Sequence, residues 1–209
     1  MMRGGATVVA GVDEVGRGAI AGPVSVGVVV VRSDTGTAPV GLKDSKLLSP
    51  AAREALAPEV RGWAAGHCVG HASAGEIDEY GIMSALRLAA LRALANVPEV
   101  GAIILDGTHD WLSRGSELLF DPVPWPDVEV AAVTTVVRGD QRCSSVAAAS
   151  VIAKTTRDKI MCELACQWPV YRWQENKGYA APAQLAAMRT DGLCPQHRRS
   201  WALQGMLSP

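Results

Sequence analysis

The chain has 209 residues, which suits a single domain or one domain with a small appendage, and its 48% hydrophobic residues can form a sizeable core. A net charge of -1 excludes a globally basic surface, although a local basic cluster could still contact nucleic acid. The absence of a secretory signal, of an apolar run near the ~20 residues of a membrane span and of any Cys-x-x-Cys pair favours a reduced, cytoplasmic protein without a membrane partner.

The first predicted element is a buried strand over the apolar residues 8–12, followed directly by Asp13 and Glu14. Successive strand residues point to opposite faces, so adjacent acids can share one site only if the strand ends or bulges there. Gly16 and Gly18 allow such a break, because glycine tolerates positive φ and close backbone approach. Taken alone, such a segment is more often a solvated acidic pair that opens an ordinary loop.

A β-branched run over residues 22–31 predicts a second strand, paired with the first as a hairpin. Ser49 is a typical N-cap and Pro50 a typical first helical residue, so a helix is expected to continue to about Arg61. Residues 63–72 have a weaker strand pattern.

Two lysines precede this helix, Lys43 and Lys46, with Asp44 and Ser45 between them. A helix N-terminus favours anions, so a bound phosphate would explain lysines at this position. A solvated surface lysine is the commoner explanation.

The middle of the chain predicts a helix over Ile82–Leu94 and a strand over residues 100–105 that ends in Asp106. Residues 108–127 are irregular, and loops of this length are usually functional or mobile. The next strand is expected over Val128–Val137, shortly before Asp140.

A long helix is predicted from Ser144 to about Gln167, with small residues in its first turns that allow close packing on the sheet. Lys154, Arg157 and Asp158 suit the solvent face of this helix. A short helix is expected from about Pro182 to Thr190.

Four carboxylates follow predicted strands: Asp13, Glu14, Asp106 and Asp140. Clustered carboxylates repel one another unless a cation neutralises them. An all-oxygen donor set selects a hard cation, Mg²⁺ or Mn²⁺. Two such ions, roughly 4 Å apart, can activate water for an in-line displacement at phosphorus. The sequence has no Gly-x-Ser-x-Gly and no Walker A motif, so serine-hydrolase and P-loop chemistry are poorly supported.

Seven segments between about residues 8 and 203 resemble the bacterial ribonuclease HII family, in the family's order: Asp13–Gly18, Asp44–Lys46, Leu105–Gly107, Gly139–Asp140, Ser145–Lys154, Lys177–Tyr179 and His197–Ser200. The Asp-Glu-x-Gly-Arg-Gly element is the most specific of them. The chain departs from the family's pattern in its longer gap between Asp106 and Asp140, and in Arg138 where lysine is more usual. The absence of an extra domain before Val8 argues against the related ribonuclease HIII.

The resemblance implies an α/β ribonuclease H-like fold, with a mixed five-stranded sheet flanked by helices. Residues 1–167 would form the catalytic domain, and residues 168–209 a small helical C-terminal part packed on it. The implied activity is that of an endoribonuclease that cuts the RNA strand of RNA–DNA hybrids. It would also nick DNA on the 5′ side of single embedded ribonucleotides, leaving 3′-hydroxyl and 5′-phosphate ends. We expect a monomer that uses two Mg²⁺ or Mn²⁺ ions.

By resemblance, each candidate site residue has a role. The metal-binding acids would be Asp13, Glu14, Asp106 and Asp140, and the loop that senses the 2′-hydroxyl would be Gly16, Arg17 and Gly18. Tyr179 would stack on the deoxyribose that follows the ribonucleotide, and Ser45 and Lys46 would contact phosphate. Two alternatives remain open: a nuclease of this fold that cuts only longer hybrids, and a hybrid-binding module without activity. The presence of all four acids argues against the second.

Overall fold

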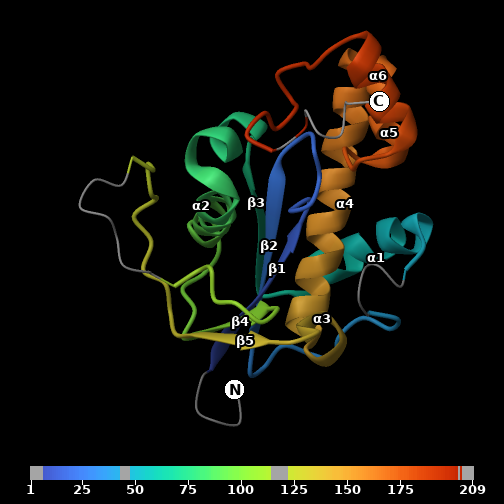
Figure 1. Cartoon of the computed structure of the whole chain (residues 1–209). Coiled ribbons are helices and arrows are strands. Elements are labelled where there is room, and N and C mark those ends of the chain that lie inside the picture. Colours follow the sequence, from blue (N-terminus) through green and yellow to red (C-terminus); the bar gives the residue numbers. More distant parts are fainter. Residues whose placement is uncertain (1–6, 43–47, 114–121, 202, 204–209) are drawn as a thin grey trace.

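The structure, a computed structural model, describes residues 7–42, 48–113, 122–201 and 203 (Figure 1). Its centre is a five-stranded mixed sheet of strand order β3-β2-β1-β4-β5, which confirms the predicted fold class. The predicted phosphate contacts Ser45 and Lys46 lie outside the described residues. The strands are β1 (Val8–Val15), β2 (Val24–Arg32), β3 (Gly66–Ala72), β4 (Ala102–Asp106) and β5 (Val133–Val136).

The pairing of β1 with its two neighbours ends at different residues. β1 and β2 form the predicted antiparallel hairpin, which is paired as far as Val15 opposite Ser25. On its other side β1 runs parallel to β4, and that pairing ends at Val12 opposite Leu105. The strand therefore continues three residues beyond its predicted end at Val12 and includes both acids.

Helices cover both faces of the sheet (Figure 1). One face packs against α2 through an apolar cluster that includes Val28 and Val30. The opposite face packs against α1 and α4 through a cluster that includes Val29, as expected from the alternation of side chains along a strand. The helices are α1 (Pro50–Trp63), α2 (Ala74–Leu94), α3 (Gly139–Arg142), α4 (Ser144–Gln167), α5 (Trp173–Asn176) and α6 (Pro182–Thr190), with a 3₁₀ turn over Pro169–Tyr171.

Helix α4 lies unusually close to the sheet. A Cβ on Gly11 of β1 would lie 2.2 Å from the backbone carbon of Ser145, and one on Gly27 of β2 would lie 2.4 Å from the carbonyl oxygen of Ala149. Only glycine fits at these two positions, so the predicted close packing of the small-residue turns of α4 is confirmed.

Several boundaries differ from the predicted ones. Helix α2 begins at Ala74 rather than Ile82, because Ser73 and Glu76 form a capping box. Gly81, at φ 77°, interrupts the helical geometry seven residues later. β5 covers only Val133–Val136, because its apolar pattern starts before the part that pairs with β4.

A third apolar cluster joins the end of α4 to the C-terminal elements. It contains Met161 of α4, Met188 of α6 and Leu203, together with Ile20 and Ala21 from the segment after β1. The segment that follows the Asp-Glu pair is thus packed against residues at the other end of the chain. No helix in the described part of the chain is long and apolar enough to cross a membrane.

Candidate active site

Two of the predicted acids lie at the same end of adjacent parallel strands. Since the pairing of β1 with β4 ends at Val12 and Leu105, the next residues along the two strands are Asp13 and Asp106. Asp13 is only 5% exposed. The shared strand end is the position where α/β sheets usually bind ligands.

A third acid reaches the same edge from the short helix α3. The backbone N–H of Gly139 donates to Oδ1 of Asp106 at 2.7 Å. This bond fixes the start of α3 against the end of β4, and the next residue is the buried Asp140. Arg138 makes the turn in the left-handed region, at φ 54°.

The carboxylates contact protein groups in this arrangement. Oδ1 of Asp13 accepts from the N–H of Glu14 at 2.8 Å, and Oε1 of Glu14 lies 3.8 Å from Nη1 of Arg17. Among the described residues, no three His, Cys, Asp or Glu side chains lie close enough to hold a metal ion. The donor set is nevertheless all oxygen at one strand end, which suits Mg²⁺ or Mn²⁺ by its chemistry. The four-acid metal site therefore stays a prediction.

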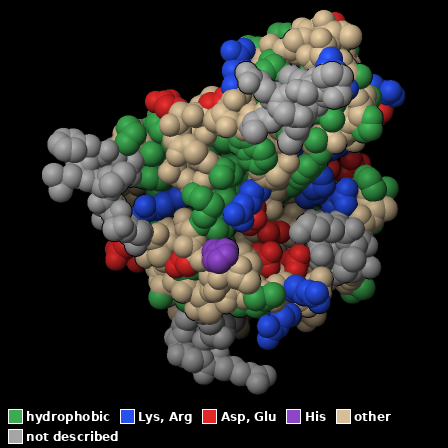
Figure 2. Space-filling model, viewed as in Figure 1, with side chains coloured by type: hydrophobic (Ala, Val, Ile, Leu, Met, Phe, Trp, Pro, Cys, Tyr) green, Lys and Arg blue, Asp and Glu red, His purple; other side chains and the backbone are tan. Residues whose placement is uncertain are grey.

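A cavity of about 360 Å³ joins several predicted site residues. Asp106 and Asp140 are not among the residues that line it. On the molecular surface, acidic side chains gather in a hollow with Lys and Arg side chains around it (Figure 2). The cavity is lined by Asp13, Glu14, Val15, Gly16, Arg17, Gly18, Ser150, Lys154 and Tyr179.

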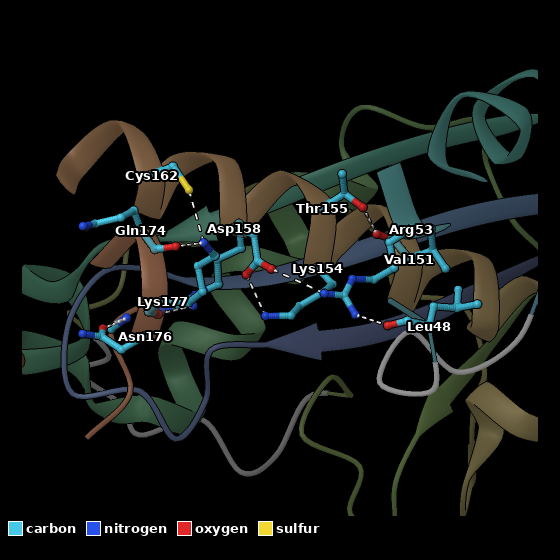
Figure 3. A network of polar contacts seen from close by, with 12 residues as sticks. Leu48, Arg53, Val151, Lys154, Thr155, Asp158, Cys162, Gln174, Asn176 and Lys177 are labelled. Carbon is cyan, nitrogen blue, oxygen red and sulfur yellow. Dashed lines mark hydrogen bonds and ion pairs between the residues drawn. The ribbon is translucent and has the colours of Figure 1, made fainter. Parts of the chain in front are cut away.

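Lys154 adds a cation to this cavity and links it to α1. Its Nζ lies 2.7 Å from Oδ1 of Asp158, as predicted for an i,i+4 pair, and Oδ2 of Asp158 lies 3.9 Å from Nη2 of Arg53 (Figure 3). Arg53 in turn donates to the carbonyl of Leu48 at 2.7 Å. Burial lowers the pKa of Lys154, and the hydrogen bond with Asp158 opposes that shift. This network holds the beginning of α1 close to α4.

Tyr179 follows a turn that is bonded to the segment after the Gly16–Gly18 loop. Lys177 and Gly178 both have positive φ, at 52° and 83°. The carbonyl of Gly178 accepts from the N–H groups of Ile20 at 2.9 Å and Ala21 at 3.1 Å. Nζ of Lys177 lies 3.2 Å from Sγ of Cys162 on α4 (Figure 3). The tyrosine, 39% exposed, therefore lies on the rim of the cavity beside the loop.

Two arginines behind this cavity were not predicted as site residues. The expectation that Arg157 belongs to a solvent face is wrong, because its side chain is fully buried, as is that of Arg198. Arginine is rarely buried in this way, so nothing in the local sequence pattern distinguishes these residues from surface arginines.

The strand order, the layers of helices and the acids at the strand ends define the class of protein: a ribonuclease H-like α/β nuclease. The family model described as Ribonuclease HII matches residues 10–204. The chain belongs to the ribonuclease HII family, and it is an endoribonuclease.

Curated relatives support this assignment over nearly the whole chain. A ribonuclease HII of Streptomyces coelicolor is 47% identical over 199 residues, which are 95% of this chain and 78% of the relative. A ribonuclease HII of Paracoccus denitrificans is 45% identical over 205 residues, covering 96% of this chain and 88% of the relative.

Solved structures share the fold. The ribonuclease H2 from Pyrococcus horikoshii OT3 has a TM-score of 0.73 and 26% identity, covering 96% of this chain and 97% of that one. A Bst-RNase HIII in complex with Mn²⁺ has a TM-score of 0.65 and 19% identity, covering 96% and 69%, and this likeness concerns the fold alone.

Proposed function

We propose that this endoribonuclease hydrolyses the RNA strand of RNA–DNA hybrids and also nicks duplex DNA on the 5′ side of a single embedded ribonucleotide. The products would carry 3′-hydroxyl and 5′-phosphate ends. The observation that supports this proposal is the cavity that joins Asp13 and Glu14 to the Gly16–Gly18 loop and Tyr179. Acids for hydrolysis and groups for sugar recognition thus lie within one nucleotide's reach.

The acids would hold the divalent ions: Asp13, Glu14, Asp106 and Asp140. Two bound Mg²⁺ or Mn²⁺ ions would supply an activated water and stabilise the leaving oxygen. The near-complete burial of Asp13 and Asp140 keeps competing water away from these two carboxylates. Lys154, which lines the same cavity, places a positive charge where a substrate phosphate would lie.

Recognition of the ribose would fall to the backbone of the loop. The 2′-hydroxyl is the group that separates RNA from DNA at a given position. Gly16 has φ 82°, and no atom lies within 4 Å of a Cβ built on Gly18, so the backbone of the loop is open to close approach. Tyr179 on the rim would stack on the next sugar, which favours an RNA-to-DNA junction.

The test is a labelled DNA duplex that carries one ribonucleotide, incubated with Mg²⁺ or with Mn²⁺, beside an all-DNA duplex of the same sequence. A nick 5′ of the ribonucleotide, with a 3′-hydroxyl end, is the expected result. Cleavage of continuous hybrids alone would favour a nuclease without junction specificity. Binding of both ribonucleotide-containing duplexes without any cleavage would contradict the proposed reaction.

A further inference from the structure

Arg157 of α4 and Arg198, which follows α6, are both fully buried. Buried arginines are normally paired with acids. Among the described residues, however, no carboxylate lies within 4.0 Å of either guanidinium. Both groups are therefore held by neutral partners, and we call them together the arginine clamp.

Arg198 donates to the backbone of the substrate-recognition loop. Its Nη2 lies 2.7 Å from the carbonyl oxygen of Gly16, and its Nη1 lies 2.9 Å from that of Arg17. Its Nε and Nη2 both lie 3.1 Å from the carbonyl oxygen of Gly22. One side chain thus fixes both ends of the segment over residues 16–22.

Arg157 holds the continuation of that segment and the tyrosine turn. It donates to the carbonyl oxygens of Pro23 at 2.8 Å, Ala21 at 3.2 Å and Lys177 at 2.9 Å. Its guanidinium carbon lies 5.7 Å from the centroid of the Tyr179 ring. The loop and the tyrosine are therefore fastened to the same side chain.

The clamp also packs tightly and is itself anchored. A Cβ on Gly16 would lie 2.1 Å from Nε of Arg157, so the guanidinium fills the space that a side chain would occupy. The turn after Arg198 is bound to α2, since the N–H groups of Arg199 and Ser200 both donate to the carboxylate of Asp78 at 2.9 Å. Burial, followed by repulsion from Arg157, lowers the pKa of Arg198 to about 9.

The direction of the loop carbonyls determines where the loop N–H groups point. In a trans peptide the C=O and the following N–H point in opposite directions. Because the carbonyls of Gly16 and Arg17 face Arg198, the N–H groups of Arg17 and Gly18 point away from it. Neither N–H has an acceptor within the described part of the protein, and both residues are exposed and line the cavity.

We infer that Arg157 and Arg198 are positioning residues for ribonucleotide recognition: they turn the carbonyls of the loop inward and so present its N–H groups, in fixed register with Tyr179, to the ribose. This inference rests on the proposed function. Selectivity for the ribonucleotide would then depend on two side chains that are covered by the loop they hold.

The test compares two substrates in each variant: a DNA duplex with one ribonucleotide and a continuous RNA–DNA hybrid. Arg198→Lys and Arg157→Lys keep the positive charge but cannot form the forked set of bonds. Each is expected to lower the ratio of kcat/KM on the first substrate to that on the second by about tenfold, the equivalent of one bond to a charged donor. A loss of stability alone would reduce both rates equally and leave the ratio unchanged.

The matched control is Arg172→Lys, the same substitution at an exposed arginine whose side chain is bonded to Glu175. It should leave the ratio within about twofold of wild type, a difference below one tenth of the hydrogen-bonding range at this scale. An unchanged ratio in folded Arg198→Lys and Arg157→Lys would overturn the inference. Failure of the proposed function would be distinct, because wild type itself would then not nick the single-ribonucleotide duplex.

A measurement on the wild-type chain decides the question if neither variant folds. Amide hydrogen exchange is followed in EDTA, with each duplex bound. The amides of Arg17 and Gly18 should exchange freely in the free protein and slow on binding the duplex with one ribonucleotide, but not on binding its all-DNA counterpart. Equal exchange with both duplexes would contradict the orienting role of the clamp.

Discussion

Asp13 is the residue whose surroundings depend most on its charge. It lies at the end of β1, 5% exposed, beside the strand end that carries Asp106. We expect Asp13→Asn to reduce cleavage by about three orders of magnitude or more, since stabilisation of several kcal/mol would be lost and each 1.4 kcal/mol is tenfold in rate. Binding of the hybrid, measured by fluorescence anisotropy, should remain largely intact.

Asp34→Asn is the control for this prediction, because Asp34 is exposed in the loop after β2. Its activity should equal that of wild type. Full activity in Asp13→Asn would contradict the assignment of Asp13 to a metal site.

Tyr179 gives a second prediction at the scale of the residue. Stacking on an aromatic ring is worth about 1–3 kcal/mol, so Tyr179→Ala should reduce kcat/KM on single-ribonucleotide duplexes by roughly 5- to 150-fold. Longer hybrids should lose less, because they do not depend on one junction. An equal loss on every substrate would argue against recognition of the junction.

Single residues also show where sequence reasoning stops. Asp13, Glu14 and Tyr179 belong to short motifs, so they could be selected from the sequence, and the structure places all three around one cavity. Arg157 and Arg198 could not be selected, because their importance comes from contacts with carbonyls more than 130 positions away for Pro23 and 180 for Gly16. Local patterns carry no information about such contacts.

Helix α2 illustrates electrostatics at the scale of an element. Its capping box places Oε2 of Glu76 2.8 Å from the N–H of Ser73, and Arg92 lies 2.6 Å from the same carboxylate. The hydrogen bond from Arg92, aided by Ser73 and opposed by burial, lowers the pKa of Glu76 from 4.5 to about 2. Since the pKa is lowered by folding, the stabilisation is complete above about pH 4.5 and is lost as pH falls toward 2.

Glu76→Gln should therefore lower the free energy of unfolding by about 1–2 kcal/mol at pH 7. In urea denaturation, the difference from wild type should shrink between about pH 4.5 and pH 2. Glu79→Gln, at an exposed position of the same helix, serves as the control. A difference that does not change with pH would mean that the carboxylate charge is unimportant.

The contact between α4 and the sheet gives another prediction for an element. A Cβ on Gly27 would lie 2.4 Å from the carbonyl oxygen of Ala149, so Gly27→Ala must push the helix away. We expect a loss of about 1–3 kcal/mol in the free energy of unfolding by urea titration. Gly36→Ala, where no atom lies within 4 Å of the added Cβ, should have little effect.

Elements with strong local signals were predictable and others were not. The hairpin of β1 and β2, the Ser49 cap of α1 and the full length of α4 follow from β-branched runs, turn residues and capping chemistry. The early start of α2 was missed because Gly75 and Gly81 weaken its helical pattern, although Ser73 and Glu76 signal the cap. β5 was predicted too long because only pairing with β4 determines where it begins and ends.

At the scale of the whole molecule, the C-terminal elements support the catalytic half. The cluster of Ile20, Ala21, Met161, Met188 and Leu203 is completed only by residues after α4. A chain that ends at Gln167 should therefore lose its cooperative thermal transition or melt well below the full-length protein, since it exposes this apolar surface. Melting at the full-length temperature would show that residues 168–209 are dispensable for folding.

The overall arrangement was the part of the fold least accessible from local patterns. Strand periodicity does not determine the order β3-β2-β1-β4-β5, nor that Asp13 and Asp106 end side by side. Resemblance to a family supplied that expectation, because relatives share the long-range contacts that composition and periodicity leave open.

The donors that hold the loop are made last. Gly16 leaves the ribosome early, whereas Arg198 follows 182 residues later, which at 5–20 residues per second is a delay of roughly 10–40 s. A nascent chain therefore carries its first acids well before their neighbouring loop can take its final shape. A premature stop codon just before Arg198 would leave the strands and acids in place, but the protein would have no means of fixing the loop.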